Sequence, residues 1–73
     1  MMRHGPYVAE IEFDEDEGLF HGRSMNVQPG GFDFWGSSVD ELRREFAASA
    51  KMHEEFCREQ GLQLVVSPFA EAV

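Results

Sequence analysis

Four consecutive carboxylates, residues 14–17, separate two segments that both read as β-strands. In the first, Tyr7–Phe13, every second side chain is apolar, and Gly18–Met25 reads as the second; this period of two is typical of half-buried strands. Ionised carboxylates are costly to bury without partners, so the segment between the strands is expected to be a solvent-exposed loop. The sequence therefore predicts an antiparallel hairpin, around which every other element must be placed.

A short third strand is predicted after the Pro29-Gly30-Gly31 break. Phe32 and Phe34 alternate there with Asp33 and Trp35, which places the two phenylalanines on one face of the strand. The three strands form an antiparallel meander whose aromatic face needs a cover.

An amphipathic helix supplies that cover. Ser38 is the expected N-cap, and Glu41, three residues later, completes a capping box; Gly61 is the expected stop. Apolar positions recur at three- and four-residue spacing between them. The predicted apolar face comprises Val39, Leu42, Phe46, Ala50, His53 and Cys57, with Ala47 and Phe56 beside them.

The segment Leu62–Val66 is almost entirely apolar and reads as a final strand. A right-handed crossover through the helix would place it parallel to the first strand, in the order 3-2-1-4. The predicted fold class is α+β: one domain over residues 1–73, with the order β-β-β-α-β and one helix on one face of the sheet.

Net charge and chain length indicate which classes of molecule this chain can bind. Six Lys and Arg against fourteen Asp and Glu give a formal net charge of −8, which repels nucleic-acid phosphate and favours a basic protein. We expect no DNA binding by this chain alone. A chain of 73 residues buries only about 60% of its unfolded surface, so we expect a homodimer or higher oligomer.

The same sequence favours a cytoplasmic protein. Cys57 is the single cysteine, which fits a reducing compartment. No segment approaches the roughly 18 apolar residues of a membrane span, and the amino end lacks the apolar core of a signal peptide.

The acidic loop has the wrong spacing for a calcium site. An EF-hand loop needs Gly at position 6 and Glu at position 12, whereas counting from Asp14 places Leu19 and Met25 there. We expect no metal, no cofactor and no catalytic residue. The enzymatic alternative is a metal-dependent nuclease using Asp14, Asp16 and either Glu10 or Glu12.

Two further side chains are candidates for partner contacts. Alternation places His21 on the outer face of its strand, where it could serve as a general base, contact a partner or simply be solvated. Trp35 is directed away from the phenylalanine face, and exposed tryptophans are frequent in interface hot spots. The alternative for Trp35 is packing against the start of the helix near Val39.

Two motifs carry a family resemblance: the hairpin E12-F-D-E-D-E-G-L-F-H-G-R23 and the segment F34-W-G-S-S-V-D-E-L-R-R-E-F46. In this order and at this separation they resemble the HicB antitoxins of bacterial toxin–antitoxin pairs, over about residues 7–69. The resemblance implies a partial RNase H-like domain without the catalytic acids of the nuclease. It also implies a partner, a small basic HicA-like RNase toxin that the antitoxin occludes.

Family members commonly continue into a DNA-binding domain, whereas the given sequence ends with residues 67–73, so we expect no DNA-binding domain in it. An orphan, self-associating acidic module remains an alternative function. The expected toxin contacts are Glu10, Glu12, Asp14, Glu15, Asp16, Glu17, His21, Arg23, Asp33 and Trp35.

Overall fold

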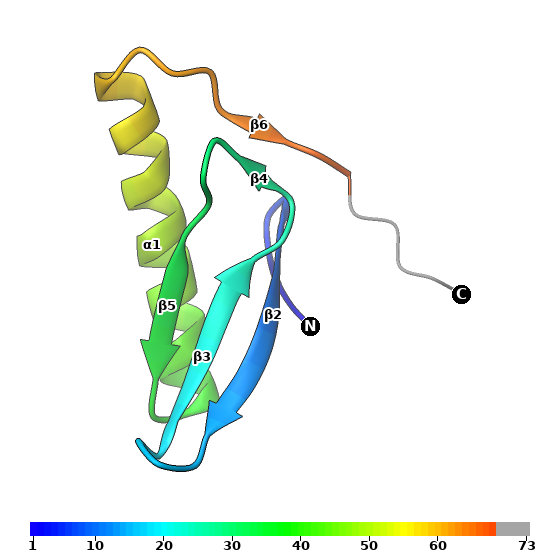
Figure 1. Ribbon diagram of the computed structural model, residues 1–73, viewed down its shortest axis with the longest axis vertical. Coiled ribbons are helices and arrows are strands. Elements are labelled where there is room, and N and C mark those ends of the chain that lie inside the picture. The colour runs from blue at the N-terminus through cyan, green and yellow to red at the C-terminus, as the bar shows by residue number, and fades with distance from the viewer. Residues whose placement is uncertain (69–73) are drawn as a thin grey trace.

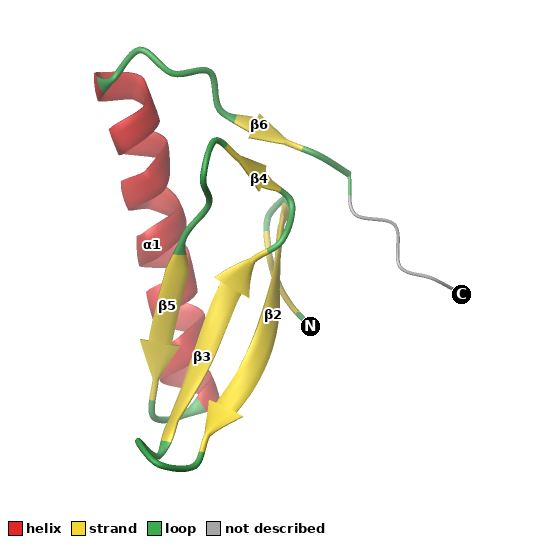
Figure 2. Ribbon diagram, viewed as in Figure 1, coloured by secondary structure: helices red, strands yellow, loops and turns green. Residues whose placement is uncertain are grey.

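The computed structural model describes residues 1–68 and has an α+β architecture. One helix lies behind a single antiparallel sheet, and two short strands lie beyond one end of that sheet (Figure 1, Figure 2). The elements are β1 (Met2–His4), β2 (Tyr7–Asp14), β3 (Leu19–Ser24), β4 (Val27–Gln28), β5 (Asp33–Gly36), α1 (Val39–Glu59) and β6 (Val65–Val66). Within residues 1–68, no helix is long and apolar enough to cross a membrane.

The predicted meander is confirmed. Strands β2, β3 and β5 are neighbours and antiparallel, and the hairpin register pairs Phe13 with Phe20. The pairing of β3 with β5 places Gly22 opposite Phe34.

The predicted order 3-2-1-4 is wrong at its last position. The free side of β2 is occupied by β1, which pairs with it in antiparallel orientation, with His4 opposite Tyr7. Gly5 forms the intervening turn with a positive φ of 56°. A neighbour reached through a two-residue turn has a small loop-closure cost, and it takes the edge that the prediction gave to the final strand.

The final strand is also shorter than predicted and is not parallel to the first. Instead of Leu62–Val66 in the main sheet, β6 pairs in antiparallel orientation with β4, with Val27 opposite Val66. Residues 69–73, which include the last part of the segment resembling HicB, lie outside the described residues.

The buried Asn26 holds this small second sheet against the first. Its Oδ1 accepts a hydrogen bond from the Val8 N–H at 3.0 Å, and its Nδ2 donates to the Pro6 and Ser67 carbonyls at 2.9 and 2.8 Å. The Ser67 N–H in turn donates to the Asn26 carbonyl. Three chain segments therefore meet at one side chain, which leaves its buried amide fully bonded.

The helix begins and ends where its capping residues predict. Ser38 Oγ accepts a hydrogen bond from the Glu41 N–H at 3.1 Å, while the Glu41 carboxylate accepts from the Ser37 N–H, one residue before the position expected in a capping box. After the last helical turn, Gly61 adopts a φ of 68°, as helix-terminating glycines commonly do.

The predicted apolar face of the helix is correct at its centre and wrong at two positions. Leu42, Phe46 and Ala50 are buried, but Val39 is 51% exposed and Phe56 is 50% exposed. Val39 is the first helical residue. At 100° per residue, Phe56 points roughly 80° away from the direction of Phe46.

The core lies between the helix and the sheet. Phe34 stacks on Phe46, with ring centroids 4.5 Å apart, and Gly22 provides the space for this stack. A Cβ at Gly22 would lie 2.2 Å from the Phe34 ring, so only glycine fits there. The buried cluster comprises Tyr7, Ala9, Val27, Phe34, Leu42, Phe46 and Ala50.

Candidate functional site

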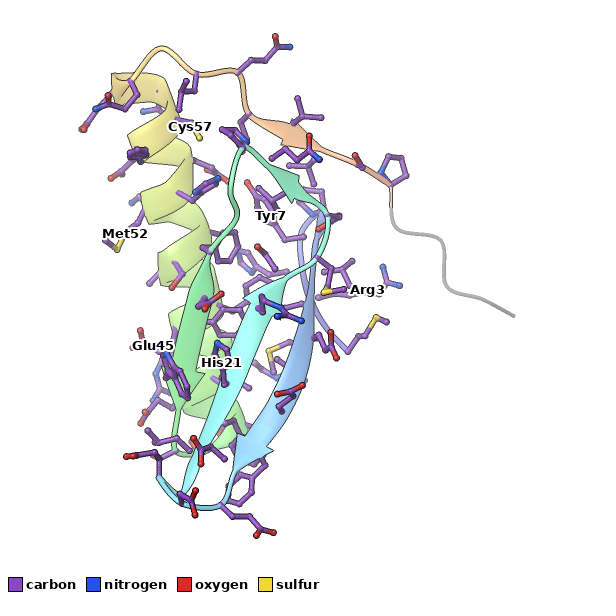
Figure 3. The ribbon with its side chains drawn as sticks, viewed as in Figure 1. Arg3, Tyr7, His21, Glu45, Met52 and Cys57 are labelled. Atoms are coloured by element: carbon purple, nitrogen blue, oxygen red, sulfur yellow. The ribbon has the colours of Figure 1, made fainter. Side chains whose placement is uncertain are left out.

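The face of the sheet opposite the helix assembles the predicted polar residues. We call it the outer face and define it by Glu10, Glu12, His21, Arg23, Asp33 and Trp35. Figure 3 shows His21 in front of β3, with the helix behind the sheet. The alternation read from the sequence is therefore confirmed for all three strands.

The strand register arranges these side chains in two rows across the sheet. The first row runs from Glu12 through His21 to Trp35, because His21 is opposite both of the others in its neighbouring strands. The second row runs from Glu10 through Arg23 to Asp33. The Cβ atoms of directly opposite residues on one face of a sheet lie about 5 Å apart, so the members of each row are neighbours, and His21 also reaches Asp33 in the second row.

His21 and Trp35 form a stacked pair at the centre of the outer face. Their ring centroids are 4.1 Å apart and their planes differ by 14°. Trp35 is 45% exposed. Trp35 therefore packs on His21 and keeps nearly half of its surface available to a partner.

The two ion pairs on the outer face are of different quality. Arg23 Nη2 lies 3.5 Å from Glu10 Oε2, and both side chains are well exposed; such pairs contribute at most about 1 kcal/mol. His21 Nε2 lies 3.2 Å from Asp33 Oδ2, close enough for an ion pair when the imidazole is protonated. The contact lacks hydrogen-bond geometry, however, and this buried nitrogen has no hydrogen-bond partner among the described residues.

The acidic loop is a turn stabilised by its own first carboxylate. Asp14 Oδ1 accepts hydrogen bonds from the Asp16 and Glu17 N–H groups at 3.0 and 3.2 Å. The Gly18 N–H donates to the Asp14 carbonyl at 2.8 Å. Asp14 thus orders the loop, whereas Glu15, Asp16 and Glu17 are exposed.

An open hollow of about 300 Å³ lies on the outer face next to this loop. Its lining combines aromatic and acidic side chains from all three strands of the meander and the loop. The lining residues are Glu12, Phe13, Asp14, Glu15, His21 and Trp35.

Most of the net charge is concentrated here. The outer face and the loop contain seven carboxylates and one guanidinium, Arg23. By contrast, four of the six basic residues lie on α1, among six acidic residues. The helix side is therefore of mixed charge and the outer face is strongly negative.

These carboxylates are not grouped as metal ligands among the described residues. Among residues 1–68, no group of three or more His, Cys, Asp or Glu side chains is placed to hold a metal ion. The nuclease alternative requires acids that meet at one point, and the geometry gives it no support.

Sequence reasoning missed one polar cluster on the helix side. The Tyr7 hydroxyl donates a hydrogen bond to the Glu54 carboxylate. Burial, and then this bond and the charge of Glu54, raise the pKa of Tyr7 to about 12. His53 Nε2 lies 3.7 Å from the Sγ of the buried Cys57. His53, which is predicted to lie on the apolar face of the helix, is half-buried.

Comparisons with protein-family models, with curated proteins and with solved structures found no match to this chain.

Proposed function

We propose that this chain is a cytoplasmic, HicB-like antitoxin that binds a small basic HicA-like RNase and blocks its active site. The observation that carries the proposal is the outer face: an acidic surface around an exposed aromatic side chain, opposite the only helix of the described part. The resemblance of residues 12–23 and 34–46 to the HicB family supports the choice of partner. On the same basis, the proposal assigns the α+β architecture to the partial RNase H-like fold of that family.

Electrostatics favour a basic partner at this face. Glu12, Glu15 and Glu17 have no basic side chain in salt-bridge range among the described residues. An RNase surface that binds RNA is positively charged, so the two surfaces attract each other over a Debye length of about 8 Å at physiological salt. Complementary charge of this kind raises the association rate and favours the correct partner.

Trp35 is the expected anchor of the complex. Fully covering its 45% exposed side chain would bury about 110 Å² of a residue that offers about 250 Å². At about 25 cal/mol per Å², this corresponds to roughly 3 kcal/mol. A loss of that size raises the dissociation constant about 100-fold.

Self-association is a second candidate that complements the first. Large apolar side chains remain exposed on the helix and on the second small sheet, with Met52 at 68% and Val65 at 45% exposure. Met52 belongs to α1 and Val65 to β6, so a homodimer formed through them would leave Glu12, His21 and Trp35 open to the toxin.

Surface plasmon resonance against a purified HicA-like RNase tests the proposal. Reversing Glu15, Asp16 and Glu17 to Lys, while keeping the turn-forming Asp14, should lower the association rate and flatten its salt dependence. Trp35→Ala should mainly raise the dissociation rate.

Ala48→Ser on the exposed helix surface is the control and should change neither rate. Circular dichroism establishes that every variant is folded. If the charge reversal leaves the association rate and its salt slope unchanged, the acidic loop does not face the partner and the proposed binding face is wrong.

A further inference from the structure

The hollow beside the stacked pair has the chemistry of a receptor for one cationic, planar side chain. Its lining includes the acidic residues Glu12 and Glu15 together with His21 and Trp35, whose rings stack on each other. Neither lysine nor arginine lines it. We propose that this hollow binds an arginine side chain of the protein partner, with the guanidinium against the aromatic pair and its N–H groups donating to the carboxylates.

Arginine fits this lining better than lysine or a metal ion. A guanidinium stacks on aromatic rings and donates to two carboxylates in its own plane, whereas an ammonium is a compact, strongly hydrated charge. Cation–π contacts are strongest with tryptophan. The carboxylates of the described residues are not grouped to hold a metal, which leaves an organic cation as the matching ligand.

The three carboxylates that line the hollow differ in how far they are available to a ligand. One of its carboxylate oxygens is already occupied by the Asp16 and Glu17 N–H groups, so Asp14 contributes charge to the rim while it fixes the loop. The carboxylates of Glu12 and Glu15 have no basic partner in range within residues 1–68. These two acids are therefore available to an incoming guanidinium.

This inference rests on the proposed function for the source of the arginine, but it is testable without the toxin. Trp35 is the single tryptophan, so its indole N–H gives one peak in a ¹⁵N-correlated NMR spectrum. The probe is acetyl-Gly-Arg-Gly-amide, titrated against the intact chain. Matched peptides contain citrulline, which keeps the shape without the charge, or lysine, which keeps the charge without the plane.

We expect a saturable shift of the Trp35 indole peak with the arginine peptide, at least tenfold weaker binding of the citrulline peptide and several-fold weaker binding of the lysine peptide. The double variant Glu12→Gln/Glu15→Gln should weaken arginine binding at least fivefold. The control Glu55→Gln/Glu59→Gln removes the same charge from exposed helix positions and should leave binding unchanged.

Equal shifts with the arginine and citrulline peptides, or equal weakening by the two double variants, would overturn the inference. If the double variant Glu12→Gln/Glu15→Gln binds the toxin as tightly as the original chain, the arginine site is refuted and the proposed function is not. Conversely, arginine-peptide binding without any toxin binding would retain the site and reject the proposed function.

Discussion

Replacing Asn26 by alanine should destabilise the protein more than any exposed polar substitution. The change removes the acceptor of the Val8 N–H and the donor to the Pro6 and Ser67 carbonyls. Val8 is 2% exposed, so its N–H stays buried without a partner, at a cost of about 1–3 kcal/mol. Pro6 and Ser67 are exposed, so water replaces the lost donors and each bond costs only about 0.5 kcal/mol.

The sum is on the order of 3 kcal/mol, a large fraction of the roughly 4–11 kcal/mol expected for a domain of this length. With an m-value of about 1 kcal/mol/M, the urea midpoint should fall by about 3 M. Urea titration followed by circular dichroism measures this change. Hydrogen exchange should accelerate at the Val8 and Ser67 amides before it does at the amides of α1.

Two further variants separate the hydrogen bonds from simple disturbance of β4. Asn26→Asp keeps the acceptor for Val8 but sets a carboxylate against two carbonyl oxygens, so it should be at least as destabilising as alanine. Gln28→Ala, at an exposed position of β4, should change stability by no more than about 0.5 kcal/mol. A loss below that value for Asn26→Ala would refute the role assigned to this side chain.

Three other predictions concern the core and assembly. Tyr7 is the only tyrosine; with its pKa raised to about 12, its absorbance at 295 nm should titrate well above the usual value of about 10. Folding favours the neutral phenol, so this contribution to stability is present below pH about 10 and is lost between about pH 10 and 12. Glu54→Gln should lower the midpoint of the Tyr7 titration only in part, because the burial of Tyr7 remains. An unchanged midpoint would exclude the contribution of Glu54. Gly22→Ala should lower the free energy of unfolding by about 2–3 kcal/mol, because the new methyl group overpacks against Phe34. Gly18→Ala only strains a left-handed turn and should cost roughly 1–2 kcal/mol. Urea titration that ranks the two variants in the opposite order would contradict the packing of Phe34 over Gly22. Sedimentation equilibrium at micromolar concentration should give a mass above the 8.3 kDa of one chain, and a value equal to it would exclude self-association.

The parts of the fold that follow from neighbouring residues could be predicted from the sequence. The hairpin, the Ser38 cap and the Gly61 stop depend on contacts within a few positions, where propensity and capping chemistry decide the outcome. The strand pairings at the sheet edge could not be predicted in the same way. Met2–His4 has no apolar alternation to identify it, and a two-residue strand such as β6 carries too little pattern to specify its partner.

The candidate site was predictable as a face but not as a set of contacts. Alternation placed Glu12, His21 and Trp35 on one side of the sheet, yet the stacking of the two rings follows from the register of β3 with β5. That register depends on the fit of Phe34 over Gly22 in the core. The turn-forming role of Asp14 was missed, although an aspartate two residues before a loop N–H is a known turn signal.

An RNA cleavage assay with a purified HicA-like RNase tests the proposed function most directly. An equimolar amount of this chain should stop cleavage of a labelled RNA, and the variant Glu12→Lys/Glu15→Lys/Trp35→Ala should fail to do so. The helix-side variant Glu55→Lys/Glu59→Lys should inhibit as well as the original chain. Undiminished cleavage in the presence of excess of this chain, or RNA cleavage by this chain itself with magnesium, would contradict the account.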